Sequence, residues 1–267
     1  LNVGAGAGAT AVATAKAAEA AAARDSADNY ATAAGNSAAA AAASAAEAAS
    51  YGGGGGPFNF VTNPSGLIRQ FTSGTVVIPA GGNQWVADQV YVVSGGAPEA
   101  SVDVVKYITE RGDGVGIRVT ATAALAAPAS NDLLQILWPL EGILTNGLGW
   151  DAPGGQPATL SFDASCSVPG TYGVSIHTRD VLETIPFNIS VTATPQRFVL
   201  NVPARPAIGG SWVTGVGKAG YLIISPVAGS NYAASASGAW VPYGARKGPG
   251  ACNFASTAGA TFHVANV

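Results

Sequence analysis

The sequence predicts a mainly β protein in which a β-sandwich or jelly-roll head follows an Ala-rich α-helical stalk. Three features indicate this fold class. About half of residues 1–50 are Ala, residues 52–56 are all Gly, and short β-type runs then alternate with Gly, Pro, Asn and Ser. We therefore divide the chain into a stalk (residues 1–51), a hinge (52–57) and a head (58–267).

The stalk is expected to be helical from about residue 10 to residue 50, because Ala has the highest intrinsic helix propensity. Such a helix has few large apolar side chains to bury within one chain. A seven-residue spacing, as in coiled coils, predicts that stalks associate, and it falls on Tyr30, Ser37, Ser44 and Tyr51. A single isolated helix stays open as the alternative.

Composition argues against two classes of partner. Only 10% of residues are charged and the formal net charge is -3, so no basic face is available for a phosphate backbone. The Ala-rich segment is weakly apolar and carries charges such as Lys16 and Glu47, whereas a spanning helix needs about 20 predominantly apolar residues. We expect neither a nucleic-acid partner nor membrane insertion.

The head contains many short runs of β-branched and aromatic residues bounded by turn signals. The predicted strands are 75–79, 85–93, 100–110, 115–122, 132–140, 157–166, 171–178, 183–192, 196–203, 220–226 and 260–267. Short strands at this spacing favour two packed antiparallel sheets.

An ordered series of motifs runs through the head. Its clearest members are NQWVADQVY at 83–91, ATLSFDAS at 158–165, PGTYGVS at 169–175 and TPQRF at 194–198. The series resembles the carbohydrate-binding-module-like jelly-roll domain of bacteriophage tail fibres. Gln89-Val90 stands where that family has Arg-Trp, and Pro195 stands where it has Trp.

The resemblance implies a virion fibre, usually a homotrimer, that joins other virion structural proteins and faces a host surface glycan. It implies architecture and context and transfers no individual sugar-binding residue. We therefore expect a structural fibre protein with a receptor-binding head. A structural connector or capsid fibre without receptor binding is the main alternative, and a glycan-degrading spike is a further one.

Exposed aromatic rings are the first candidates for contacts with a sugar, because ring faces stack on its C–H groups. Trp85 and Trp138 lie in apolar runs and are expected in the core. Segment 227–250 is the longest irregular stretch, and long loops on a rigid scaffold commonly carry binding. The candidate ligand contacts are Trp150, Asp151, Trp212, Trp240, Tyr243, Arg246 and Lys247. Core packing or a trimer interface is the alternative role of these aromatics.

Catalytic and metal-binding chemistry have no clear signature in the sequence. Glycan hydrolysis needs two carboxylates flanking a cleft, and no acidic pair in the head stands out by context. The two histidines, His177 and His263, and the two cysteines, Cys166 and Cys252, are too scattered for a zinc motif. We expect no enzyme activity, cofactor or metal, and two buried free thiols.

Overall fold

The computed structural model describes residues 11–21, 23–27, 30, 59–61, 69, 74–109, 112–206, 209–250 and 252–267. The chain divides into two units, residues 1–58 and residues 59–267. No helix in the described ranges combines the length and the hydropathy that a membrane crossing requires.

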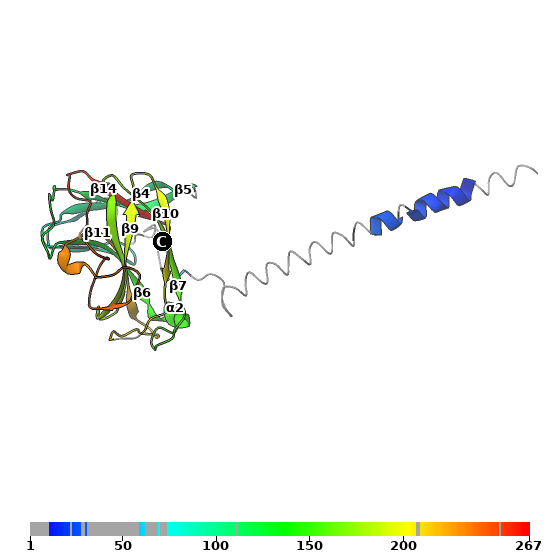
Figure 1. Cartoon of the computed structure of the whole chain (residues 1–267). Coiled ribbons are helices and arrows are strands. Elements are labelled where there is room, and N and C mark those ends of the chain that lie inside the picture. Colours follow the sequence, from blue (N-terminus) through cyan, green and yellow to red (C-terminus); the bar gives the residue numbers. More distant parts are fainter. Residues whose placement is uncertain are drawn as a thin grey trace, which may run out of the picture. The chain divides into compact units, whose positions relative to one another are not determined.

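In the first unit, the structure describes a short helix at residues 11–21 and 23–27 (blue in Figure 1). Its described side chains are exposed, and Lys16 Nζ lies 3.4 Å from Glu19 Oε2 one turn later. Tyr30 is helical and exposed. The other positions of the seven-residue spacing, Ser37, Ser44 and Tyr51, lie outside the described residues, as does the expected hinge at 52–57.

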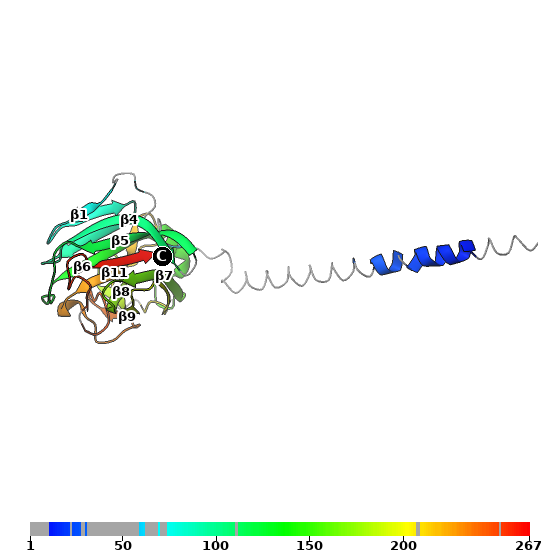
Figure 2. The same cartoon turned by 90° about the horizontal axis from the view of Figure 1, so that it is seen from above.

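The second unit is a β-sandwich of two antiparallel sheets, as predicted (Figure 2). The six-stranded sheet has the order β1 (Val76–Ile78), β4 (Ala100–Thr109), β5 (Gly112–Ala121), β14 (Thr261–Ala265), β7 (Ala158–Cys166) and β10 (Gln196–Val202). The eight-stranded sheet has the order β12 (Val241–Pro242), β9 (Glu183–Val191), β8 (Gly170–Thr178), β11 (Lys218–Ala228), β6 (Leu133–Glu141), β3 (Val90–Gly95) and β2 (Asn83–Ala87), and β13 (Cys252–Asn253) pairs with β11.

One predicted strand is two strands in the structure. Residues 85–93 were expected as a single run, but the chain reverses at Asp88 and Gln89, and β2 pairs with β3. Gln89 has a φ of 59°, a conformation suited to a tight turn. The short elements α2 (Gly142–Thr145), η1 (Asn146–Leu148), η2 (Ser230–Tyr232), β12 and β13 were not predicted.

The core lies between the sheets and is built by residues that alternate along each strand. In β6, for example, Leu134, Ile136 and Trp138 are fully buried in the main hydrophobic cluster. The core position expected for Trp138 is confirmed. Cys166 and Cys252 are free and buried, in agreement with the expectation of two buried thiols.

The position expected for Trp85 was wrong. Its side chain is 49% exposed, and its ring packs beside Tyr91 with centroids 4.9 Å apart. The two residues face each other across the β2–β3 hairpin at the edge of the eight-stranded sheet. Trp85 therefore belongs to the surface.

Candidate functional site

The outer face of the eight-stranded sheet, which points away from the core, has a continuous row of side chains. Tyr91, Leu137, Ile223 and Ser175 are successive cross-strand partners on β3, β6, β11 and β8. Leu137 and Ile223 are buried but lie outside the main core cluster. This outer face is therefore covered over part of its area.

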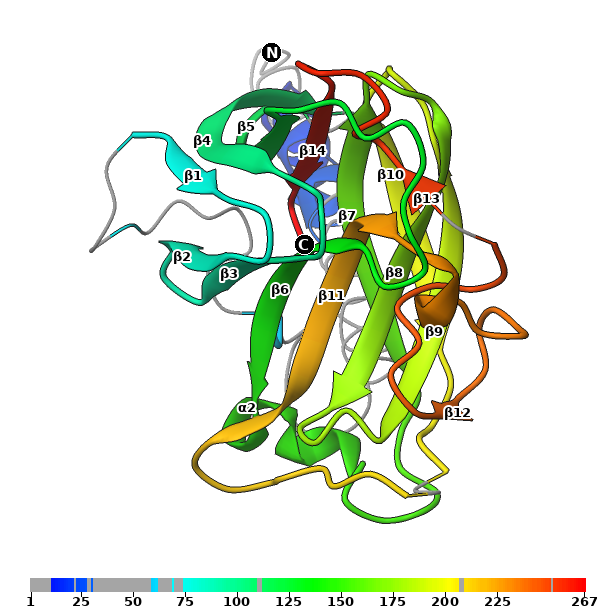
Figure 3. The same cartoon turned by 90° about the vertical axis from the view of Figure 1, so that its left-hand side faces the viewer.

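Part of that cover is a loop segment, residues 229–250, which follows β11 and lies beside β9 (orange in Figure 3). Ser237 Oγ accepts a hydrogen bond from the Asn188 amide at 3.1 Å, and Gly238 N donates to Pro186 O at 2.7 Å. Asn188 Nδ2 donates to Pro249 O at 3.0 Å. The rigid sheet thus positions a long segment that has little regular structure of its own.

An open pocket of about 570 Å³ lies within this segment. Its lining residues come from two runs of the segment, 231–235 and 241–246, and combine two tyrosines and an arginine with small, polar and apolar side chains. They are Asn231, Tyr232, Ala233, Ala234, Ser235, Val241, Pro242, Tyr243, Gly244, Ala245 and Arg246. The pocket therefore lies in the segment from which the sequence predicted binding, and it includes two of the predicted contacts, Tyr243 and Arg246.

Tyr243 is the most exposed aromatic residue of this pocket, with 72% of its surface accessible. Its φ is 63°, a left-handed conformation that is uncommon for a bulky side chain. Two backbone hydrogen bonds hold it there: Tyr243 N donates to Leu182 O at 2.8 Å, and Ala245 N donates to Tyr243 O at 2.7 Å. A strained backbone of this kind costs about 1–3 kcal/mol and is found preferentially at functional sites.

Arg246 lies against His177, which projects from β8. Arg246 Nη1 is 2.5 Å from His177 Nδ1, and Ser175 Oγ is 2.8 Å from His177 Nε2. Burial, together with the nearby guanidinium, holds the pKa of His177 well below its ordinary value, so the imidazole is neutral at pH 7. A neutral ring can accept from Arg246 through Nδ1 and donate to Ser175 through Nε2.

These contacts do not provide an acceptor for every hydrogen-bond donor of Arg246. Its guanidinium carbon is 6.0 Å from the centroid of the Tyr232 ring, and its Nε is buried without a hydrogen-bond partner. Burial lowers the pKa of Arg246 to about 10, which leaves it cationic at neutral pH. The site therefore combines an exposed ring with a half-buried positive charge.

Lys247 was also a predicted ligand contact, but the structure gives it a different place. Its side chain is fully buried, and Nζ donates to the carbonyl oxygens of Gly248, Pro249 and Gly250 at 3.4, 3.1 and 3.0 Å. It does not line the pocket. Lys247 instead ties together the backbone of the loop that follows Arg246.

Two tryptophans among the candidate ligand contacts are buried. Trp150 and Trp212 are 1% and 5% exposed, and their rings pack edge to face with centroids 4.9 Å apart. Half-buried Trp240 packs against Trp150 at 5.5 Å. These indoles fill the interior, the alternative that the sequence left open. Asp151 is exposed and does not line the pocket.

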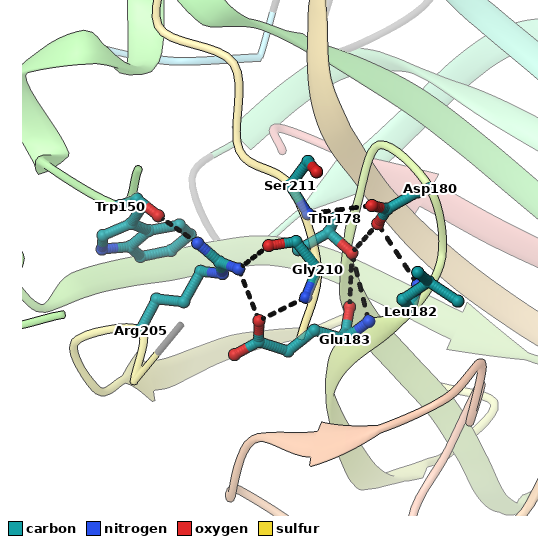
Figure 4. A network of polar contacts seen from close by, with 8 residues as sticks. All are labelled: Trp150, Thr178, Asp180, Leu182, Glu183, Arg205, Gly210 and Ser211. Carbon is teal, nitrogen blue, oxygen red and sulfur yellow. Dashed lines mark hydrogen bonds and ion pairs between the residues drawn. The ribbon is translucent and has the colours of Figure 1, made fainter. Parts of the chain in front are cut away.

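A polar network fixes the β8–β9 turn beside the pocket (Figure 4). Buried Arg205 pairs with Glu183, whose Oε2 also accepts from Gly210 N at 3.2 Å. Asp180 Oδ1 accepts from Thr178 Oγ1 at 2.8 Å and from Leu182 N at 3.3 Å. Because Leu182 O receives the Tyr243 amide, this network positions the strained tyrosine.

Three residues, two beside the pocket and one in the Trp85–Tyr91 pair, were not predicted from the sequence to lie where they do. Tyr232 lies in the predicted binding segment but has no local signal of its own, and His177 faces Arg246 only because β8 lies beneath the loop. Trp85 was assigned to the core from its apolar neighbours. In the described part of the chain, no three His, Cys, Asp or Glu side chains lie together in a way that could hold a metal ion.

The comparisons with known proteins return structural likenesses only. No family model and no curated protein matches the sequence. The family 11 carbohydrate-binding module of a cellulosomal cellulase of Clostridium thermocellum is 12% identical and has a TM-score of 0.36, and the match covers 73% of this chain and 94% of that module. A family 30 carbohydrate-binding module is 12% identical with a TM-score of 0.31, over 74% of this chain and 84% of that one.

A third similar structure is the enzymatically active domain of tailspike protein 4 of bacteriophage CBA120. It is 14% identical with a TM-score of 0.36, and the match covers 78% of this chain. This chain spans only 21% of the length of that tailspike structure. Similarity at this level leaves function to be argued from the residues of the pocket.

Proposed function

We propose that the head is a glycan-binding domain and that the pocket within residues 231–246 is its binding site. The observation that carries this proposal is Tyr243, an exposed ring that the fold holds in a strained conformation at the rim of an open pocket. A free aromatic face suits the apolar C–H surface of a sugar ring, and the polar side chains of Asn231 and Ser235 suit its hydroxyl groups.

The chemistry of the lining residues favours binding over catalysis. Hydrolysis of a glycosidic bond uses two carboxylates on either side of the bond. The residues that line the pocket are aromatic, amide, hydroxyl, small apolar and guanidinium groups. We therefore propose a binding protein rather than an enzyme.

We further propose that the chain is part of a virion fibre and forms a homotrimer through its stalk. Support comes from the tail-fibre resemblance of the head motifs and from the Ala-rich helix, whose described side chains are exposed in the single chain. Isolated helices are marginally stable in water, so association would stabilise this one. Three linked heads would also raise the effective affinity for a host surface glycan.

Light scattering on the full chain tests the assembly. We expect the mass of a trimer, and a monomer at micromolar concentration would contradict this part of the proposal. We expect such a fibre also to bind other structural proteins of the virion.

A glycan array probed with the full chain tests the binding function. We expect binding to a defined set of glycans, a loss of about tenfold or more in Tyr243→Ala, and little change in Trp85→Ala. Loss in Trp85→Ala alone would move the site to the Trp85–Tyr91 pair. No binding to any glycan would refute the function and favour a structural connector.

A further inference from the structure

The C-terminal part of the chain contains basic residues but no acidic residues. No Asp or Glu follows Glu183, whereas Lys and Arg occur at 197, 205, 218, 246 and 247. Two of these cations find acidic partners earlier in the chain: Arg197 Nη1 lies 3.4 Å from Asp163 Oδ1, and Arg205 pairs with Glu183. The other three cations, Lys218, Arg246 and Lys247, contact groups that are not carboxylates.

Arg246 has no carboxylate partner among the described residues. Its side-chain contacts are the neutral imidazole of His177 and the ring of Tyr232. The next residue, Lys247, is also a cation, and its ammonium is surrounded by carbonyl oxygens. The residues lining the pocket include an arginine and no acidic side chain. The pocket therefore has an excess of positive charge in a protein whose net charge is -3.

This arrangement is costly unless a negative group compensates it. A guanidinium removed from water loses hydration, and an uncompensated buried charge destabilises a fold. Arg246 Nε has no hydrogen-bond partner, and Nη1 is engaged with His177. An anionic oxygen in the pocket would supply an acceptor for Nη2, the end of the guanidinium for which no described group serves as acceptor, and hydrogen bonds between charged groups are among the strongest in proteins.

We infer that the pocket selects an acidic sugar, whose anionic group accepts hydrogen bonds from Arg246 while its ring packs on Tyr243. This inference rests on the proposed glycan-binding function. The anionic group is a carboxylate, as in a uronic or sialic acid residue, or a sulfate ester, because both present anionic oxygens that accept a charge-assisted hydrogen bond from a guanidinium N–H.

The test compares matched ligands on the full chain. An array of neutral, carboxylated and sulfated oligosaccharides identifies the ligands, and each acidic ligand is paired with its carboxyl-reduced or desulfated form. We expect binding only to acidic members, with a loss of about tenfold or more when the charge is removed, since a hydrogen bond to a charged group contributes about 1.5–3 kcal/mol. Loss of binding after carboxyl reduction identifies a carboxylate as the recognised group, and loss after desulfation identifies a sulfate.

Two arginine variants test whether Arg246 itself recognises the acidic group. Arg246→Gln is expected to lose about tenfold or more in affinity for the acidic ligand. Arg179→Gln, which removes the same charge from an exposed residue outside the pocket, should stay within about twofold. If Arg246→Gln fails to fold, as circular dichroism would show, Arg246→Lys keeps the charge and the paired ligands still decide the question with the native chain.

The outcomes separate this inference from the proposed function. Equal binding of an acidic ligand and its neutral form, or binding to neutral glycans alone, would overturn acidic selection and leave glycan binding intact. Absence of binding to every glycan on the array would overturn both.

Discussion

Glu183 and Arg205 form an ion pair in the interior of the head, with Arg205 Nη2 at 2.5 Å from Glu183 Oε2 and side chains that are 0% and 1% exposed. Glu183 is also the residue of β9 that pairs with Pro242 of β12, directly before Tyr243. A buried pair that does not line the pocket therefore helps to fix the strand that leads directly into Tyr243.

Replacing one partner of this pair should destabilise the head strongly. We expect Glu183→Gln to lower the free energy of unfolding by about 3–5 kcal/mol, because it leaves the guanidinium of Arg205 buried without a counter-charge. Urea denaturation measures the change. In the more exposed Arg118–Asp103 pair, Asp103→Asn should cost at most about 1 kcal/mol. Equal losses in the two variants would contradict the role assigned to Glu183.

Strain at Tyr243 can be separated from the function of its ring. Tyr243→Gly and Tyr243→Ala both remove the ring, so both should lose glycan binding. The Gly variant should be more stable than the Ala variant by about 1 kcal/mol, because Gly adopts the φ of 63° without a steric cost. Thermal or urea unfolding measures the difference, and equal stability of the two variants would show that the backbone is not strained.

The contact between β8 and the loop segment 229–250 depends on a glycine. A Cβ at Gly173 would lie 2.5 Å from Lys247 Cβ and 2.8 Å from Arg246 O, so Gly173→Ala should displace the loop and lower stability by about 1–3 kcal/mol. Glycan affinity should fall with it. Gly170→Ala on the same strand is the matched control, because its Cβ meets nothing closer than 3.6 Å. A Gly173→Ala variant with native stability and affinity would contradict this packing.

Stability should decrease as the pH falls below the ordinary histidine value of 6.5. Burial lowers the pKa of His177 in the folded state, so the unfolded chain binds the proton first and acid favours unfolding. The pKa of His263 is also lowered by burial, and it adds to the same trend. Unfolding free energies at pH 5 and pH 8 should therefore differ less in His177→Gln and in His263→Gln than in the native chain. An unchanged pH dependence in both variants would contradict the assignment.

Much of the sandwich could be predicted from the sequence because strands leave a local signature. The nearly continuous apolar run 132–140 and the alternating run 171–178, both bounded by turn residues, correspond closely to β6 and β8. The β2–β3 hairpin was missed because its turn, Asp88-Gln89, carries no glycine. The face on which Trp85 lies depends on the pairing register, and a shift of one residue reverses that face.

The structure places a pocket in segment 227–250, which the sequence proposed as a binding segment, but several of the candidate ligand contacts do not line that pocket. Trp150 and Trp212 lie in Gly-rich surroundings, yet they are buried because distant loops pack together at one end of the sandwich. Lys247 follows Arg246 directly, yet the chain turns its ammonium into a ring of carbonyl oxygens. Such placements depend on tertiary contacts that no local pattern encodes.

The most direct measurement is the map of amide chemical-shift changes when a glycan identified on the array is titrated into the isotope-labelled full chain. The account predicts that the largest changes fall on residues 231–246 and on the neighbouring β8–β9 turn. Changes centred on Trp85 and Tyr91, or no saturable change with any glycan, would contradict it.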